Sequence, residues 1–149
     1  RRENNRASHE RKAQSQRESH ERRLQEEQRQ HDRRQWLLAE RRRVYAHLAS
    51  LSATVDKSKP YELKDLAEAC SEIELLSDSG AVVASARDLY GAQFRARKKA
   101  REMAEAGLIP EEEEEYIKLH RDKDMHRENF IENARHDLGL DMRPGQTGA

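Results

Sequence analysis

The sequence is poor in cysteine, proline, glycine and aromatic residues, and it has no long apolar run. Its single cysteine, Cys70, excludes an internal disulfide and a cysteine-based zinc site and is typical of a reducing compartment. Among 149 residues there are three prolines, six glycines, four tyrosines, two phenylalanines and one tryptophan. No segment approaches the roughly 18 to 20 apolar residues that cross a bilayer, and no signal-peptide pattern is present.

Charged residues are abundant instead. They make up 39% of the chain against 34% hydrophobic residues, a balance that favours extended helices over a large compact core. The formal net charge is zero, but residues 1–43 contain 14 Arg or Lys and 8 Asp or Glu, whereas residues 44–149 contain 15 and 21. The chain therefore has a basic N-terminal part and an acidic remainder.

An 11-residue repeat marks the first 35 residues. Each histidine is followed by one acid and two bases, in the segments His9-Glu10-Arg11-Lys12, His20-Glu21-Arg22-Arg23 and His31-Asp32-Arg33-Arg34. Eleven residues make almost three helical turns, so the repeated groups form a stripe along one helix. Successive histidines lie about 16 Å apart along the axis, too far for one helix to chelate a metal ion, so ligation would require equivalent histidines of neighbouring chains in a parallel bundle. Polar residues on a solvated repeat are the favoured interpretation. We therefore expect no metal and no cofactor.

Neither proline nor glycine occurs before Pro60, which predicts one uninterrupted helix over about residues 5–55. Before Trp36 the only aliphatic residues are Ala7, Ala13 and Leu24, and we expect Trp36 to be the first core residue. After it, an apolar stripe predicts either a core face or a self-association surface. The stripe consists of Leu37, Val44, Leu48, Leu51 and Val55.

Three shorter helices are expected after Pro60. The second covers about residues 60–76, and the third covers about 80–106, with N-cap chemistry from Ser77 to Gly80 and a left-handed cap at Gly107. Pro110 is expected to open the fourth, with the acids of residues 111–115 in its first turn and Gly139 at its end. The expected apolar faces are Leu63, Leu66, Ala67, Cys70, Ile73 and Leu76; then Val82, Val83, Ala86, Leu89, Tyr90 and Phe94; then Tyr116, Ile117, Phe130, Ile131, Ala134 and Leu138.

These patterns predict an all-α fold. One very long N-terminal helix is expected to pack with its C-terminal half against two or three shorter helices in a coiled-coil-like helical bundle. The expected organisation is a polar Arg-rich helical stalk with 11-residue repeats over residues 1–35, an antiparallel helical bundle over 36–138 and a flexible tail over 139–149. Narrow apolar stripes make a marginal monomer, which favours a homo-oligomer or association with another helical protein.

An arginine set is the candidate site for binding an anionic surface. It comprises Arg22, Arg23, Arg33, Arg34, Arg41, Arg42 and Arg43, and it would bind an anionic membrane surface or nucleic acid. Interleaved acids argue against nucleic acid, because they repel a polyanion and form intrahelical pairs such as Glu18 with Arg22. No aromatic side chain precedes Trp36 to stack on bases. No catalytic constellation is found, and Cys70 on an apolar face is typical of a buried thiol.

Several segments together give the chain a resemblance. They are Arg41-Arg42-Arg43-Val44-Tyr45-Ala46, Glu72-Ile73-Glu74-Leu75-Leu76, Val82-Val83-Ala84-Ser85-Ala86-Arg87 and Phe130-Ile131-Glu132-Asn133-Ala134-Arg135-His136-Asp137-Leu138-Gly139. In the order and residue types of these segments, over residues 20–140, the chain resembles uncharacterised actinobacterial helical proteins. Many of those proteins have an N-terminal membrane segment. The resemblance implies a helical, membrane-tethered protein and gives no catalytic residue to transfer.

The expected function is therefore a non-enzymatic interaction module, a self-associating helical adaptor. We expect a cytoplasmic protein, held at the inner face of the membrane if an anchor precedes residue 1, where the basic part would contact anionic lipids. The alternative is a nucleic-acid-binding protein that uses the Arg-rich N-terminal helix. Salt separates the two, because phosphate contacts weaken steeply between about 50 and 200 mM salt, whereas apolar association persists.

Overall fold

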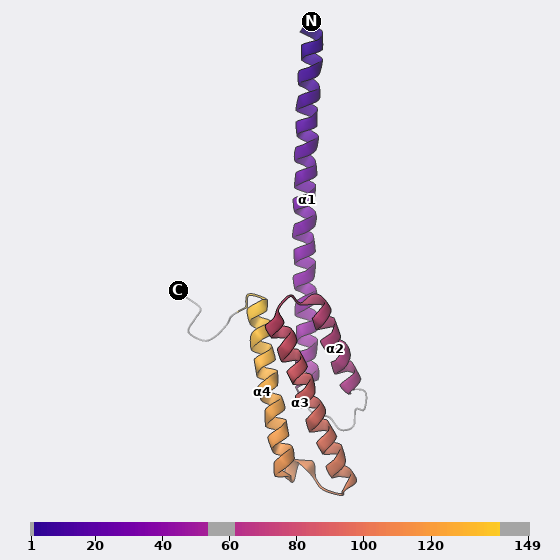
Figure 1. Cartoon of the computed structure of the whole chain (residues 1–149), viewed down its shortest axis with the longest axis vertical. Coiled ribbons are helices and arrows are strands. Elements are labelled where there is room, and N and C mark those ends of the chain that lie inside the picture. Colours follow the sequence, from indigo (N-terminus) through magenta and orange to yellow (C-terminus); the bar gives the residue numbers. More distant parts are fainter. Residues whose placement is uncertain (1, 54–61, 141–149) are drawn as a thin grey trace, which may run out of the picture. The chain divides into compact units, whose positions relative to one another are not determined.

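The structure is a computed structural model that describes residues 2–53 and 62–140. Within these residues the fold is all-α, as predicted, with four α-helices and one short 3₁₀ helix (Figure 1). The chain divides into two compact units, Arg1–Leu38 and Ala39–Ala149. We call residues 2–38 the arm and residues 39–140 the bundle.

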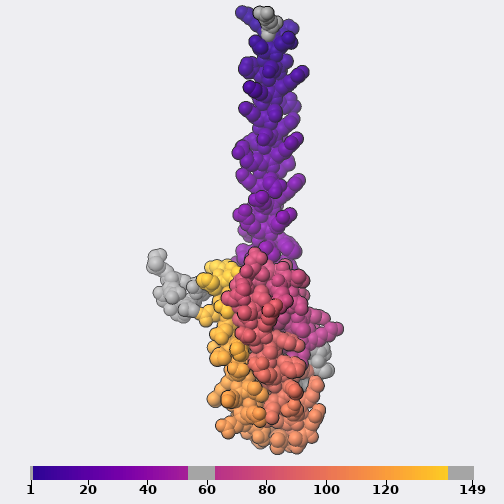
Figure 2. All heavy atoms as spheres, viewed as in Figure 1, coloured from indigo at the N-terminus to yellow at the C-terminus, as the bar shows by residue number. Residues whose placement is uncertain are grey.

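Helix α1 extends over Arg2–Leu51, so its first part forms the arm and its last part belongs to the bundle. The absence of proline and glycine leaves its hydrogen-bond ladder unbroken. In the arm, every described side chain is exposed except those of Ala13, Leu37 and Leu38, which are half-buried, and Figure 2 shows these side chains standing out around a single helix. Trp36 is 60% exposed, so the prediction that it begins the core is wrong.

Helices α2 and α3 follow the sequence signals closely. Helix α2 covers Glu62–Leu76 and α3 covers Gly80–Glu105, within two residues of the expected bounds. Ser79 is the N-cap of α3, and its Oγ accepts a hydrogen bond from the amide of Val82 at 3.2 Å. Gly107 has φ +77°, the left-handed conformation that ends a helix most easily at glycine. Both end signals are therefore confirmed.

Helix α4 covers Glu114–Asp137 and begins later than predicted. Pro110 opens a separate 3₁₀ helix, η1, over Pro110–Glu112. The backbone then becomes extended at Glu113 (φ −93°, ψ 126°), so a new helix starts only after this residue. Glu114 and Glu115 still occupy the first turn, where acids meet the positive end of the helix dipole. Gly139, with φ +72°, follows the helix as expected.

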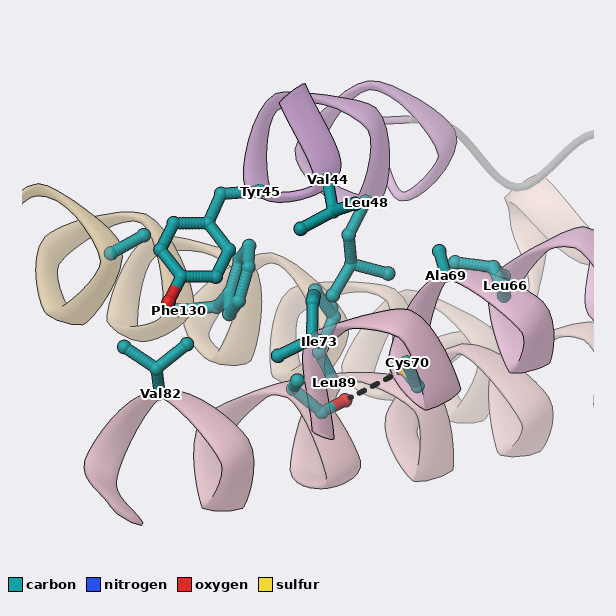
Figure 3. Close-up of a cluster of buried hydrophobic side chains, with 12 residues drawn as sticks. Val44, Tyr45, Leu48, Leu66, Ala69, Cys70, Ile73, Val82, Leu89 and Phe130 are labelled. Carbon is teal, nitrogen blue, oxygen red and sulfur yellow. Dashed lines mark hydrogen bonds between the residues drawn. The ribbon is translucent and has the colours of Figure 1, made fainter. Parts of the chain in front are cut away.

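The core of the bundle draws on all four helices. Tyr45 of α1 lies beside Phe130 of α4, and Leu48 points toward Ile73 of α2 (Figure 3). The rings of Tyr45 and Phe130 meet edge to face, with centroids 6.0 Å apart and planes at 87°, a favourable aromatic geometry. The long helix thus packs with its C-terminal part on the shorter helices, as predicted. The buried cluster consists of Val44, Tyr45, Leu48, Leu66, Ala69, Cys70, Ile73, Val82, Ala86, Leu89, Phe130 and Ala134.

A row of buried side chains, called the lane below, lies between α3 and α4. On α3 it continues beyond Leu89 through Gln93 at spacings of three and four residues, and it ends against Tyr116 of α4. The lane passes through Gln93 and not through its neighbour Phe94, which is 43% exposed. The predicted core position of Phe94 is therefore wrong. The remaining members of the lane on α3 are Ala96, Ala100 and Met103.

Candidate functional site

The predicted core or self-association stripe is divided between several environments. Val44 and Leu48 are buried in the bundle, with 1% and 0% of their surface exposed. Leu51 packs against the same core, Leu37 is half-buried in the arm, and Val55 lies outside the described residues. Because the chain's own helices cover Val44 and Leu48, these side chains cannot contact a second chain without unfolding the bundle.

The arginines predicted to bind an anionic surface do not form one site. Arg42 is exposed and lines a groove of the bundle. Four more are exposed side chains of the arm: Arg22, Arg23, Arg33 and Arg34. Arg22 and Arg33 lie on one side of the helix, and Arg23 and Arg34 lie about 100° round from them, so the four do not form a single site.

Arg41 and Arg43 have structural contacts. The Arg41 side chain donates to the carbonyl oxygen of Leu76 at 2.6 Å and to the carboxylate of Asp78 at 3.0 Å. Leu76 is the last residue of α2, where carbonyls lack intrahelical donors and favour a cation. Arg43 forms an ion pair with Glu72 of α2 at 3.1 Å. Both arginines therefore fasten α1 to α2.

Two cations of α4 hold the end of α1 in the same way. Lys123 is completely buried, and its Nζ donates to the carbonyl oxygen of Ser52 at 3.1 Å and to the carboxylate of Asp124 at 2.6 Å. Arg127 Nε donates to the carbonyl oxygen of Ala49 at 2.9 Å. These carbonyls lie at the negative end of the α1 dipole, so a buried ammonium is stabilised there.

Asp124 responds to this arrangement. Partial burial by itself raises the pKa of its carboxyl, but the hydrogen bond and charge of Lys123 lower it more. His120 adds to the lowering, with its Nδ1 3.3 Å from the carboxylate. The pKa of Asp124 is therefore held below its usual value, and the group remains ionised beside the buried lysine.

Sequence reasoning missed Lys123 and Arg127, although a signal was present. Lys123 lies seven residues after Tyr116 and seven before Phe130, which places it on the buried lane of α4. A cation at such a position needs polar partners on a neighbouring element, since a buried charge without them is very costly. The end of a neighbouring helix satisfies that need, and here the end of α1 does so.

Tyr45 is a second buried polar group that the sequence did not single out. Its hydroxyl donates to the Asp137 carboxylate at 2.7 Å and lies 2.7 Å from Ser77 Oγ. Burial raises the pKa of the Tyr45 phenol to about 12, and Asp137 contributes to the rise. The hydroxyl is therefore a fixed, protonated hydrogen-bond donor that joins α1 to the end of α4.

An open groove of about 410 Å³ runs along the bundle beside Tyr45, between α1 and α4. Its lining is mostly apolar and includes Ala46, Phe130 and Ile131, with Arg42 and Arg135 as its charged residues. The groove therefore offers apolar contact and positive charge.

Cys70 has a structural environment, in agreement with its position on an apolar face. Its thiol donates to the carbonyl oxygen of Ala86 at 3.6 Å, the contact that is dashed in Figure 3. Burial raises the pKa of the Cys70 thiol to about 11, so the nucleophilic thiolate is scarce at neutral pH.

The arm has one face on which its repeat places the histidines together with two aliphatic residues. At 100° per residue, the side chains of this face point within about 60° of one another. Ala13 is half-buried, Leu24 is 50% exposed and the histidines are exposed. We call this surface the histidine face and define it by His9, Ala13, His20, Leu24 and His31; the same arc of the helix also holds the charged residues Arg2, Arg6 and Glu27.

Charges of opposite sign border the histidine face. The residue after each histidine lies about 100° to one side and forms an acidic flank of Glu10, Glu21 and Asp32. The third residue after each histidine lies about 60° to the other side and forms a basic flank of Lys12, Arg23 and Arg34. All six are exposed. The repeat therefore sorts the charges by side, although the arm as a whole mixes them.

Polar contacts within the arm join glutamines to acids. Gln14 donates to Glu18 at 3.4 Å, and Gln28 donates to Asp32 at 2.9 Å. In the part of the arm that the structure describes, the predicted ion pair of Glu18 with Arg22 is absent. Arg23 lies 3.4 Å from Nδ1 of His20, and all the arginines of the arm that the structure describes have exposed side chains.

Comparison with known proteins identifies no relative. No protein-family model matches the chain, and neither the curated proteins nor the solved structures give a significant match. Among the helices described, none is long and apolar enough to span a bilayer. Over residues 2–53 and 62–140, no three or more His, Cys, Asp or Glu side chains gather into a group that could hold a metal ion. The function is therefore inferred from the surfaces of the arm and the bundle.

Proposed function

We propose that this protein is a non-enzymatic interaction module, a helical adaptor that self-associates through its arm. The exposure of the arm carries this proposal, since 36 residues of α1 precede Leu38 with all but two of them exposed. Isolated helices are marginal in water, and helices in proteins gain most of their stability from packing one face. A second helix that covers one face of the arm supplies that packing.

The histidine face is the surface we propose for this contact. It brings Ala13 and Leu24 to one side of the arm, and the imidazole rings add area that can be covered on association. Self-association through Val44 and Leu48 is not part of the proposal, because both are core residues of the bundle. The proposed contact surface is therefore the histidine face of the 11-residue repeat and not the apolar stripe at the end of α1.

A non-enzymatic role accords with the contacts of the buried reactive groups. The Tyr45 hydroxyl is bonded to Asp137, the Lys123 ammonium to the end of α1, and the Cys70 thiol to a backbone carbonyl. Each group has a structural partner that accounts for its position.

Substitution of Leu24 tests the proposal. We expect analytical ultracentrifugation of the full chain to show a concentration-dependent mass above the 17.4 kDa of the monomer. Leu24→Glu places a charge in the histidine face and should reduce association by about tenfold or more, while the matched variant Gln25→Glu, about 100° further round the helix, should leave it unchanged. A wild-type chain that stays monomeric at high concentration would overturn the proposal.

Nucleic-acid binding is the second candidate, favoured by the exposure of the arm's arginines. Arg22 and Arg33 lie on the side of the arm opposite the histidine face, so Arg22→Glu with Arg33→Glu tests this candidate separately. If the arm binds phosphates, the double variant should weaken binding of a DNA or RNA duplex, and binding should fall steeply with salt. Equal binding by both chains would remove this candidate.

Location at the cytoplasmic face of a membrane is a further part of the proposal and rests on the resemblance to membrane-tethered helical proteins. The same exposed arginines would contact anionic lipid headgroups. Co-sedimentation with vesicles of anionic lipid, but not with neutral vesicles, is the expected result. Equal partition with both kinds of vesicle would argue against this location.

A further inference from the structure

We infer that the partner on the histidine face is a second copy of this chain, aligned parallel and in register. The inference rests on the proposed self-association of the arm and adds its direction and register. The carrying observation is the placement of the acidic flank and the basic flank on opposite sides of one exposed face.

Charge complementarity sets the direction. In a parallel pair of helices with twofold symmetry, the left side of one face meets the right side of the other, so the basic flank of each copy lies against the acidic flank of its partner. In an antiparallel pair, each flank meets the same flank of the other copy, which places base against base and acid against acid. All three repeats contribute the same signs, so the parallel pair gains attraction along the whole face and the antiparallel pair gains repulsion.

The repeat also sets the register. A shift of one repeat moves the two helices by about 16 Å and keeps the signs matched, but it leaves the first repeat of one copy and the last repeat of the other without a partner. The unshifted pair matches all three repeats and places Leu24 against its own copy. An 11-residue period corresponds to a pair of helices with a slight right-handed supercoil.

Several charges of the arm do not fit this pairing. Arg17 lies on the side of the acidic flank and Glu26 on the side of the basic flank. Arg2, Arg6 and Glu27 lie within the histidine face, where an in-register pair brings each of them near the same residue of the other copy. Glu27 also borders His31, four residues further along the same face. Glu27→Gln should therefore tighten association severalfold, a change that a pairing through another face would not produce.

Cross-linking measures direction and register together. Ala13→Cys and Gln35→Cys, made singly in the full chain, place thiols about 33 Å apart along the same side of the helix. We expect each variant to form a disulfide-linked dimer with itself under mild oxidation. An antiparallel pair that brings position 13 to its copy separates position 35 from its copy by about 66 Å, so it cannot link both.

The controls fix the interpretation. Gln25→Cys lies outside the histidine face and should remain unlinked, and the wild-type chain, whose Cys70 is buried, should also remain monomeric on a denaturing gel. Circular dichroism checks that each variant keeps its helix. Linking at only one of positions 13 and 35, or equal linking at position 25, overturns the parallel, in-register pair.

Flank reversal gives an independent readout. The triple variant Lys12→Glu, Arg23→Glu, Arg34→Glu makes both flanks acidic, and Glu10→Lys, Glu21→Lys, Asp32→Lys makes both basic. Each should associate about tenfold more weakly than wild type at low salt, and an equimolar mixture of the two should associate again. Unchanged association of both variants overturns the inference. Because the proposed function fails only if the wild-type chain is monomeric, the two failures are distinguishable by sedimentation of the wild-type chain.

Discussion

The arm and the bundle use the same secondary structure with different sources of stability. In the bundle, twelve buried residues from four helices form one core, and charged side chains lie at the ends of neighbouring helices. In the arm, the described residues have no buried side chain, and the polar contacts join residues three or four positions apart. Long-range contacts therefore specify the bundle, whereas local contacts alone specify the arm.

Charged side chains have different environments in the bundle and in the arm. Arg41, Lys123 and Arg127 each bind carbonyl oxygens at the end of another helix, so their positive charge fixes the path of the chain. The basic side chains of the arm alternate with acids at fixed angles around the helix and remain exposed. Charge in the bundle thus joins the ends of neighbouring helices, whereas charge in the arm remains at its exposed surface.

The largest expected effect is the loss of core volume in the bundle. Phe130 is 0% exposed, so Phe130→Ala should lower the free energy of unfolding of the bundle by about 3–5 kcal/mol. Leu24→Ala in the arm removes a side chain that is 50% exposed and should change the free energy of unfolding of the bundle by less than about 0.5 kcal/mol. Urea denaturation, followed by hydrogen exchange of amides in α3 and α4, measures both. Equal effects of the two variants would contradict the separation of the units.

The next effect concerns the buried cation. Lys123→Met keeps the volume of the side chain but leaves the carbonyl of Ser52 without this donor, which should cost about 1–3 kcal/mol of bundle stability. Lys118→Met on the same helix changes an exposed lysine and should cost less than about 0.5 kcal/mol. Thermal unfolding of the two variants gives the comparison. If Lys123→Met were as stable as wild type, the ammonium would contribute nothing as a cap.

Local signals explain most of what the sequence predicted correctly. Ser79 and Gly107 were placed by short-range rules, because an N-cap hydroxyl needs an amide three residues away and a left-handed residue needs only its own backbone. The same kind of rule failed at Pro110, where one turn of 3₁₀ helix satisfies the preference of proline equally well. The bounds of α4 therefore depend on how the connection from α3 closes.

Burial was harder to predict than helix bounds. Phe94 and Gln93 are neighbours in sequence, and only the packing of α3 on α4 decides that the lane runs through Gln93. Trp36 has large apolar neighbours, yet the first fully buried side chains of α1 are those of Val44 and Tyr45. The histidine face is different, because an exposed repeat on one helix follows from sequence periodicity alone. The candidate surface could therefore be located from the sequence, whereas the exclusion of Val44 and Leu48 from it needed the tertiary structure.

A third effect should appear in alkali. Tyr45→Phe removes the hydrogen bond to Asp137 and should destabilise the bundle by about 1 kcal/mol at neutral pH. Since the pKa of Tyr45 is about 12 in the folded chain and 10.0 as the reference value, its contribution is complete below about pH 10 and is lost as the pH rises through 12. The pKa of Tyr116 is also raised, by burial, so an ultraviolet titration should show one fewer late-ionising tyrosine in the variant than in the wild type. A full complement of tyrosines ionising near pH 10 in the folded wild type would contradict this environment.

The smallest effect should appear in acid and again separates the two units. The pKa of Asp124 is lowered below 3.8 in the folded bundle, so its contribution to stability is present above that value and is lost as the pH falls through the folded pKa. Half of its side chain is exposed and solvent screens the ion pair, so Asp124→Asn should reduce the acid sensitivity of bundle unfolding only slightly. Asp32→Asn, in the exposed arm, is the control and should leave the acid unfolding midpoint of the bundle unchanged. If Asp124→Asn and Asp32→Asn gave the same acid unfolding curve as wild type, the charge of Asp124 would not stabilise Lys123 at the end of α1, and the carbonyl oxygens alone would hold the buried ammonium.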